Sequence, residues 1–115
     1  MDTGTVSSAT HSSALIWLDR SHALIAKAAD GRANVTEVDR EFDAEPAYLL
    51  RVVHEAAGCD RVVVMGTDAE RIAFEREYVA LYRRPDRLID SGTPLQPRPI
   101  ELADHLRLLE PALAG

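Results

Sequence analysis

Three aspartates follow apolar stretches of this chain, and carboxylates in such positions could hold divalent metal ions. Asp19 comes after the run Leu15 to Leu18, Asp68 follows the run Val62 to Met65, and Asp90 closes Leu88 to Asp90. A two-metal nuclease needs carboxylates that hold its ions about 3.5–4 Å apart. Aspartate also serves very often in turns and helix caps. We therefore assign these structural roles first, keep the three aspartates as weak metal candidates, and expect no metal or cofactor.

A glycine and a threonine stand between a β-branched apolar run and a charged, helix-like pattern. Backbone amides of Gly66 and Thr67 could bind a phosphate there, because a helix N-terminus favours anions. The stretch has one glycine and contains neither a GxGxxG pattern nor a GK[ST] loop. The alternative is a purely structural turn in which Thr67 or Asp68 caps the helix. Gly66 and Thr67 are candidates for a phosphate or ligand turn.

The densest positive charge in the sequence is the stretch Arg83-Arg84-Pro85-Asp86-Arg87. Arginine pairs well with phosphate, so Arg83, Arg84 and Arg87 are candidates for RNA binding. The alternative is that these charges compensate the last carbonyls and the negative end of a helix. Both interpretations stay open at this point.

No residue pattern in the chain predicts a catalytic centre. Cys59 has Asp60 beside it, which favours the protonated thiol, and the four histidines lack metal-ligand spacing. The serines lie outside any G-x-S-x-G elbow. We assign no catalytic residue and expect a protein that is not an enzyme.

Composition limits the class of protein and of partner. The chain has 115 residues, 46% of them hydrophobic, which is enough for a single core. A single cysteine fits a reducing cytoplasm, and the longest apolar runs are too short to span a membrane. The net charge of -6 argues against a protein held to nucleic acid by bulk charge, so we expect no DNA partner.

The apolar patterns predict one domain over residues 14–110, with a disordered tail over 1–13 and a short tail over 111–115. In the third strand Val35 and Val38 are three residues apart, which predicts a bulge or a shifted boundary. Strands are expected over 14–18, 23–29, 34–40, 62–65 and 87–90, and helices over 46–57, 69–84 and 97–109.

The resulting order is β-β-β-α-β-α-β-α. Three leading antiparallel strands followed by alternating units predict an α/β fold with one mixed sheet and helices packed on it. This is the order of the ribonuclease H-like folds, in the smaller version found in translational machinery components. A flavodoxin-like sheet would begin with a βαβ unit instead.

Two segments carry a resemblance to a known family. Leu15-Ile16-Trp17-Leu18-Asp19-Arg20-Ser21-His22-Ala23 resembles the opening strand and turn of the middle domain of archaeal and eukaryotic peptide-chain release factors and Pelota. Val62-Val63-Val64-Met65-Gly66-Thr67 before a charged helix, then Leu88-Ile89-Asp90, are similar to its second half. The resemblance implies a stand-alone bacterial relative of a domain that works at the ribosome and approaches transfer RNA.

One departure from the family bears on chemistry. The peptide-releasing members carry a Gly-Gly-Gln tripeptide, whereas Gln96 is the only glutamine here and lies between Leu95 and Pro97. We therefore expect a non-enzymatic module bound to the ribosome or transfer RNA, acting in stress or translational arrest. One alternative is a homodimer or partner-binding domain that pairs through an exposed sheet edge such as the third strand. Another is a metal-dependent nuclease of the ribonuclease H-like class.

Overall fold

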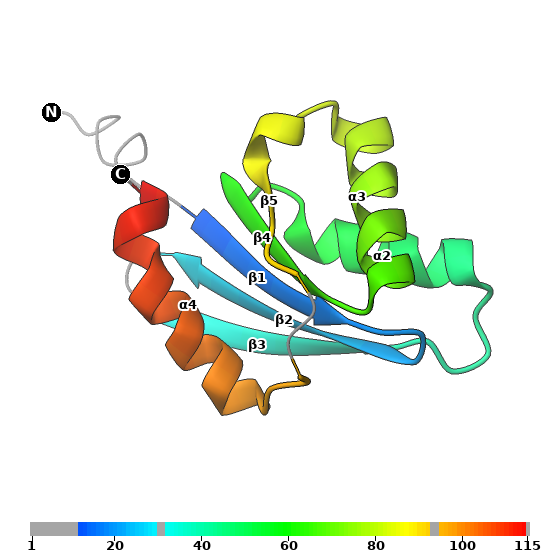
Figure 1. Cartoon of the computed structure of the whole chain (residues 1–115), viewed down its shortest axis with the longest axis horizontal. Helices are drawn as coiled ribbons and strands as arrows, with labels where there is room; N and C mark the ends of the chain where they lie inside the picture. Colours follow the sequence, from blue (N-terminus) through cyan, green and yellow to red (C-terminus); the bar gives the residue numbers. More distant parts are fainter. Residues whose placement is uncertain (1–11, 30–31, 93–94, 115) are drawn as a thin grey trace, which may run out of the picture.

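The computed structural model describes residues 12–29, 32–92 and 95–114, with side chains up to Leu109. Figure 1 shows a five-stranded sheet that carries two helices on one face and a third helix on the other. The observed order of elements agrees with the predicted order. The elements are β1 (Ser12–Leu18), β2 (His22–Ala29), β3 (Arg32–Asp39), α2 (Glu45–Ala56), β4 (Arg61–Gly66), α3 (Asp68–Tyr82), the 3-10 turn η1 (Pro85–Arg87), β5 (Leu88–Asp90) and α4 (Pro99–Ala114).

The sheet is mixed, with strand order β3-β2-β1-β4-β5. The first three strands form an antiparallel meander, while β4 pairs in parallel with β1, and β5 pairs in parallel with β4. The long β1 strand is therefore central, and its residues from Ser13 to Leu18 are all buried. This confirms the predicted mixed sheet.

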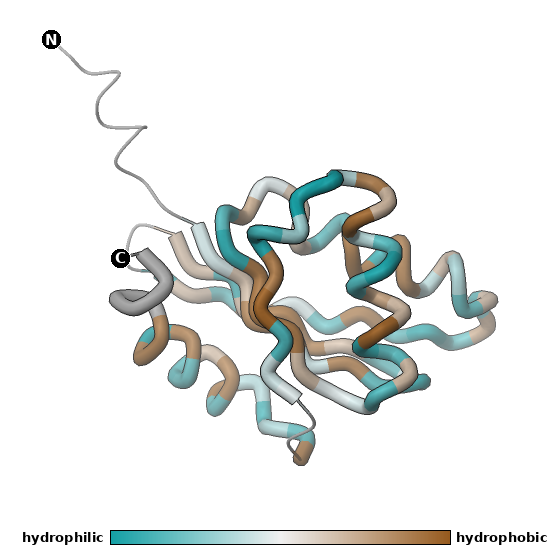
Figure 2. Tube along the Cα trace, turned by 45° about the horizontal axis from the view of Figure 1, so that its top comes forward, coloured by the Kyte–Doolittle hydropathy of each residue, from teal (hydrophilic) through white to brown (hydrophobic). Residues whose placement is uncertain are grey.

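Two apolar cores cover the two faces of the sheet, because successive strand residues point to opposite sides. On the side of α2 and α3, Ile16 of β1 packs with Tyr48, Phe74 and Tyr78. On the side of α4, Trp17 packs with Leu102 and Leu106. Figure 2 shows apolar and polar residues alternating along α4, as expected for a helix with one buried side.

The predicted bulge in the third strand is wrong. Every residue of β3 pairs one to one with β2, from Arg32 opposite Ala29 to Asp39 opposite His22. Val38 belongs to the core under α2 and α3, whereas Val35 packs on the α4 side. The two valines are three apart because they serve different faces. The shifted boundary is correct, since the strand starts at Arg32, and the Asp30-Gly31 turn lies outside the described residues.

Some boundaries and faces differ from the expectation. β1 begins at Ser12 and α4 continues to Ala114, so both extend into the segments expected to be tails, while residues 1–11 lie outside the described residues. Ile72 and Leu81 of α3 and Ile100 of α4 are about half exposed, so these large apolar residues lie outside the two cores. Among the described residues, no helix has both the length and the apolar character to cross a membrane.

Candidate functional site

Basic side chains gather at the end of the sheet where β1, β4 and β5 begin. Strand register creates this gathering: Ala29 of β2 is opposite both Arg32 and Ser12, and Arg61 starts β4 opposite Ser13. Arg87 directly precedes β5, whose first residue pairs with the residue after Arg61. Lys27, two residues from Ala29, points to the same face as Arg32. We name this region the basic end and define it by Lys27, Arg32, Arg61, Arg83, Arg84 and Arg87.

The three predicted arginines lie together in the connection from α3 to β5. Arg83 ends α3 in the left-handed conformation, with φ 55°, and its amide donates to the carbonyl of Val79. Arg84 donates to both carboxylate oxygens of Asp86, over 3.0 and 2.8 Å. This pairing lowers the pKa of Asp86 to about 2. Within the described parts of the chain, Arg83 and Arg87 form no ion pair.

The sequence analysis missed Lys27, Arg32 and Arg61 as members of this cluster. They lie far apart in the sequence, and only the pairing of the strands puts them at the same end of the sheet. Arg61 points to the face of α4, whereas Lys27 and Arg32 point to the opposite face. A local signal did exist for Arg61, since it directly precedes the buried run of β4. Residues that precede parallel strands of one sheet share an edge.

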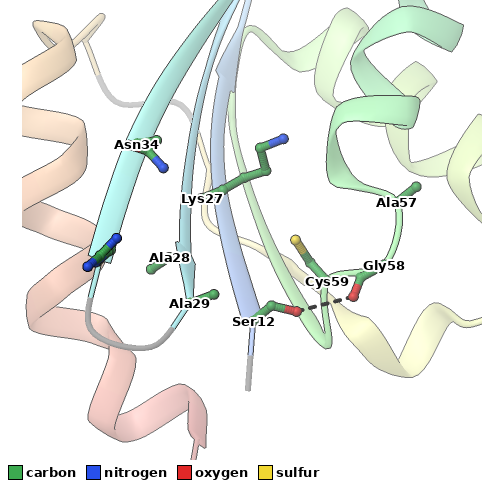
Figure 3. Close-up of a pocket in the computed structure, with 9 residues that line it drawn as sticks. Ser12, Lys27, Ala28, Ala29, Asn34, Ala57, Gly58 and Cys59 are labelled. Carbon is green, nitrogen blue, oxygen red and sulfur yellow. Dashed lines mark hydrogen bonds between the residues drawn. The ribbon is translucent and has the colours of Figure 1, made fainter. Parts of the chain in front are cut away.

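A cavity of about 360 Å³ opens at one side of the basic end, between strands β1 to β3 and the segment that follows α2 (Figure 3). Lys27 and Asn34 are paired residues of β2 and β3, so both side chains lie on the same face of the sheet. The Nζ of Lys27 is 3.0 Å from a carboxylate oxygen of Glu55. The hydroxyl of Ser12 donates to the carbonyl of Gly58 over 3.1 Å. The lining residues are Ser12, Lys27, Ala28, Ala29, Arg32, Asn34, Ala57, Gly58 and Cys59.

The side chains that line this cavity have the chemistry to bind an anion. Lys27, Arg32 and Asn34 offer hydrogen-bond donors, and small alanine side chains leave room beside them. Its size falls within the range of about 300–1,000 Å³ typical of small-ligand sites. Burial raises the pKa of the Cys59 thiol, although Lys27 acts in the opposite direction. Cys59 is therefore mainly an uncharged thiol, as expected from the sequence.

The predicted phosphate turn lies at the other end of the sheet, which we name the carboxyl end because β1, β4 and β5 finish there. The amide of Gly66 donates to the carbonyl of Gly92, and the amide of Thr67 donates to that of Leu18, both over 3.1 Å. A Cβ atom on Gly66 would be 2.0 Å from the Leu18 carbonyl oxygen. These amides are thus already used, and the glycine serves the close approach of β1 and β4.

Thr67 is the N-cap residue of α3, as predicted, but it does not cap through its side chain. Its hydroxyl is 2.6 Å from a carboxylate oxygen of Glu70, which is almost fully buried. Asp68 is the first residue of the helix and makes an ion pair with Arg71 instead of a cap. The expected side-chain cap of α3 is therefore wrong for both residues.

Asp19 has the structural role expected of it. One carboxylate oxygen accepts hydrogen bonds from the amides of Ser21 and His22, over 2.8 and 2.9 Å, and so closes the turn between β1 and β2. The hydroxyl of Tyr48 donates to the Asp19 carbonyl over 2.9 Å and fixes the turn to α2. Among the described residues there is no group of three His, Cys, Asp or Glu side chains that could hold a metal ion.

Asp68 and Asp90 are joined by an arginine rather than by a metal. Arg71 lies 2.8 Å from Asp90 and 2.9 Å from Asp68, and it also donates to the carbonyl of Gly66. Only 12% of the Arg71 side chain is exposed, because it turns to the two aspartates.

Glu75 and Asp90 form a carboxyl pair beside Arg71. Burial, followed by the hydrogen bond to Asp90, raises the pKa of Glu75 to about 7. The same hydrogen bond, with help from Arg71, lowers the pKa of Asp90 to about 2. The Oε2 atom of Glu75 is buried and has no hydrogen-bond partner among the described residues, which disfavours the charged form of this carboxyl.

Solved structures of other proteins share this fold at low sequence identity. The Pelota protein of Thermoplasma acidophilum is 18% identical, with a TM-score of 0.58, over 91% of this chain and 37% of its own. Another archaeal protein is 16% identical, with a TM-score of 0.60, over 90% of this chain and 35% of its own. The archaeal translation termination factor aRF1 is 18% identical, with a TM-score of 0.49, over 88% of this chain and 39% of its own.

This chain therefore spans less than two fifths of the length of each of these proteins. No family model and no curated protein matches its sequence. At such identities the likeness concerns the fold alone. It confirms the predicted class, a mixed α/β sheet of the ribonuclease H-like kind that Pelota also contains.

Proposed function

We propose that this protein is a non-enzymatic module that binds RNA of the ribosome, or transfer RNA, through its basic end. The observation that carries the proposal is the gathering of six basic side chains at one end of the sheet of an acidic protein. The proposal places the protein in the cytoplasm and has it act in stress or translational arrest.

The charge balance at the basic end supports RNA as the partner. Among the described residues, six cationic side chains lie there with three carboxylates, those of Glu55, Asp60 and Asp86, while the whole chain carries -6. An acidic protein is repelled by RNA in most orientations, so only a local basic region can bind it. Binding of this kind is sensitive to salt, because phosphate contacts release counterions.

The fold also supports the proposal, without carrying it alone. Pelota has the same fold over 91% of this chain. The opening strand and turn around Asp19 resemble the middle domain of release factors and Pelota, and the Gly-Gly-Gln tripeptide is missing. A module that keeps the fold and lacks that tripeptide fits binding better than peptide release.

Ribosome binding is tested by sedimentation of the tagged protein with ribosomes through sucrose gradients, in growing and stationary cells, at low and moderate salt. The test variant replaces Arg83, Arg84 and Arg87 with glutamine. The control variant replaces Arg20, Arg98 and Arg107 with glutamine, which changes the net charge equally at exposed sites outside the basic end. We expect the wild type and the control to move with a ribosomal peak at low salt, and the test variant to stay at the top.

Two outcomes contradict the proposal. The wild type could stay at the top of the gradient in both growth states and at both salt concentrations. Alternatively, the control could lose binding as completely as the test variant, which would mean that only net charge matters. Fluorescence anisotropy with purified transfer RNA separates the two RNA partners.

A second candidate function is a homodimer formed through β3. This strand is at the edge of the sheet and is eight residues long, with β2 on one side only. A long edge strand offers unpaired amides and carbonyls to a second chain. Light scattering after size exclusion, over a hundredfold range of concentration, tests this candidate. A mass of one chain at all concentrations would contradict it.

A further inference from the structure

Phe42 is the most exposed large apolar side chain among the described residues, with a relative exposure of 103%. It lies in the connection between β3 and α2, where no neighbouring element covers it. Burying an aromatic side chain is one of the largest sources of apolar stabilisation that a residue can offer. In this fold the Phe42 ring stays exposed, so it contributes no such stabilisation.

The turn that carries Phe42 is held in place by many hydrogen bonds. The amide of Asp43 donates to the Arg40 carbonyl over 2.9 Å, which closes a tight turn with Glu41 and Phe42 at its tip. Glu41 has a φ of 50°, a conformation that residues other than glycine rarely adopt. The Arg40 side chain donates to the carbonyls of Asp43 and Arg20, over 3.0 and 3.4 Å.

Further contacts fix this turn to the sheet and to α2. The amide of Arg40 donates to the Ser21 carbonyl over 2.8 Å. This bond joins the connection from β3 to α2 to the turn between β1 and β2. The Arg51 side chain of α2 donates to the Asp39 carbonyl over 2.9 Å and pairs with the Asp43 carboxylate. Phe42 is therefore presented on a rigid support, and binding a partner would order little additional chain.

The surface around Phe42 is hollowed and acidic. A depression of about 590 Å³ lies beside it, lined by Arg20, Ser21, Arg40, Glu41, Phe42 and Asp43. Acidic residues occupy every second position from Glu37 to Glu45. Three arginines, Arg20, Arg40 and Arg51, lie among these five carboxylates. Arg40 and Arg51 are already bonded to other residues of the turn.

We propose that Phe42 and the acidic residues around it form a docking surface for a second protein, which offers an apolar pocket with a rim of lysine or arginine. The aromatic ring enters the pocket, and the carboxylates face the basic rim. Aromatic anchors of this kind dominate many protein interfaces, and complementary rim charges raise the rate of association.

The acidic surroundings favour a protein over RNA at this surface. The five carboxylates outnumber the three arginines, so a base stacked on Phe42 would bring its phosphate backbone into an unfavourable potential. The surface is also separate from the basic end. β3 runs from Arg32 to Asp39, which puts about 24 Å between the two sites at the usual rise per residue. The docking surface therefore does not depend on the proposed RNA binding.

A photo-crosslinking phenylalanine analogue at position 42 of the full chain, activated in living cells, tests the proposal. The same analogue at position 95 is the control, because Leu95 is equally exposed at 94% and lies in another connection. The protein crosslinked from position 42 is identified, purified and titrated with the wild type, Phe42→Ala, Leu95→Ala and the double variant Glu41→Lys/Glu45→Lys.

We expect a protein that crosslinks from position 42 and not from position 95. Phe42→Ala should weaken its binding about 30-fold or more, and Leu95→Ala should leave it unchanged. The double charge reversal should slow association at low salt by about tenfold, and this effect should fade at high salt. Circular dichroism of each variant verifies that it is folded.

Three results would overturn the proposal. The first is a crosslink from position 42 to RNA, and the second is the absence of any protein crosslink specific to that position. The third is a crosslinked protein that binds Phe42→Ala as tightly as the wild type. None of these results depends on the arginines of the basic end, so failure here leaves the RNA proposal standing, and the reverse also holds.

Discussion

The two ends of the sheet use arginine in opposite ways. At the carboxyl end, Arg71 is 12% exposed and contacts Asp68, Asp90 and the carbonyl of Gly66. At the basic end, the side chain of Arg84 is 48% exposed, and its one ion pair among the described residues is with its near neighbour Asp86. The first arginine is a structural part of the fold, whereas the second lies at the surface. Positive charge is therefore fixed at one end and accessible at the other.

The topology explains this difference. Four connections lie at the carboxyl end: the β1–β2 turn, the connection from β3 to α2, the start of α3 and the loop after β5. Their backbones come close enough for the Gly66 amide to reach Gly92 and for the Thr67 amide to reach Leu18. The basic end holds the connections from α2 to β4 and from α3 to β5 and keeps an open cavity. A binding site for an anionic partner is expected at the end of the sheet where arginine side chains are not needed to hold the connections between elements in place.

The largest effect that tests this comparison is the loss of stability when a glycine at each end of the sheet is replaced by alanine. Gly66→Ala at the carboxyl end should lower the free energy of unfolding by about 3 kcal/mol or more, because its Cβ would collide with the Leu18 backbone. At the basic end, the Cβ atom that Gly58→Ala adds would meet no atom within 4 Å, and the backbone of Gly58 has a φ of 85°. This substitution should cost only about 1 kcal/mol of backbone strain. Urea denaturation measures both, and equal losses would contradict a difference in packing between the two ends.

The next effect concerns the two arginines themselves. Arg71→Met keeps the apolar stem but removes the hydrogen bonds to Asp68, Asp90 and Gly66, so it should lower the free energy of unfolding by about 2 kcal/mol. Arg84→Met should produce no measurable change, because its pair with Asp86 is exposed. Chemical denaturation of both variants in the same buffer is the measurement. A loss for Arg84→Met as large as that for Arg71→Met would refute the assignment.

Much of the fold could be predicted because each element has a local signal. The apolar run before Gly66 predicted the strand over 62–65, found as β4, and the helix expected over 46–57 was found as α2. The strand order was not predicted, since pairing of β4 with β1 joins residues about 50 positions apart and leaves no local pattern. Val35 and Val38 show the same limit. Their spacing suggested a bulge until the structure showed a core on each face.

The candidate sites also divide into residues with a local sequence signal and residues that only long-range strand pairing places together. Arg83, Arg84 and Arg87 were found in the sequence because they are nearly consecutive. Lys27, Arg32 and Arg61 were missed because only strand register brings them together. The sequence does contain a sign of the Phe42 surface, an aromatic residue inside an alternating acidic stretch. Its full exposure could not be foreseen, since it depends on the conformation of Glu41 and on the contacts of Arg40.

A smaller effect tests the carboxyl pair of Glu75 and Asp90. The folded protein keeps Glu75 protonated up to about pH 7, whereas the unfolded chain loses that proton near 4.5. The folded state then binds more protons than the unfolded state, so Glu75 lowers stability as pH rises from 4.5 through 7. Glu75→Gln should match the wild type near pH 5 and exceed it by about 1 kcal/mol at pH 8, after allowance for partial exposure.

Denaturation at several pH values measures this difference, with Asp90 and Arg71 as the charged groups that face Glu75. Glu77→Gln removes the same charge from α3 and is the control for the net charge of the helix. A gain in stability that does not depend on pH, or an equal gain for Glu77→Gln, would show that the proton is not shared with Asp90.

The smallest expected effect is at Phe42. Because its side chain is fully exposed, Phe42→Ala should change the free energy of unfolding by no more than about 0.5 kcal/mol, and Leu95→Ala should behave alike. A larger loss on thermal or urea denaturation would mean that the ring packs within the fold in solution, and the docking surface would then lack its anchor. If stability is unchanged while partner binding is lost, the ring contributes only in the complex. The carboxyl end would then bind as well as support the fold, through a side chain that the fold itself does not need.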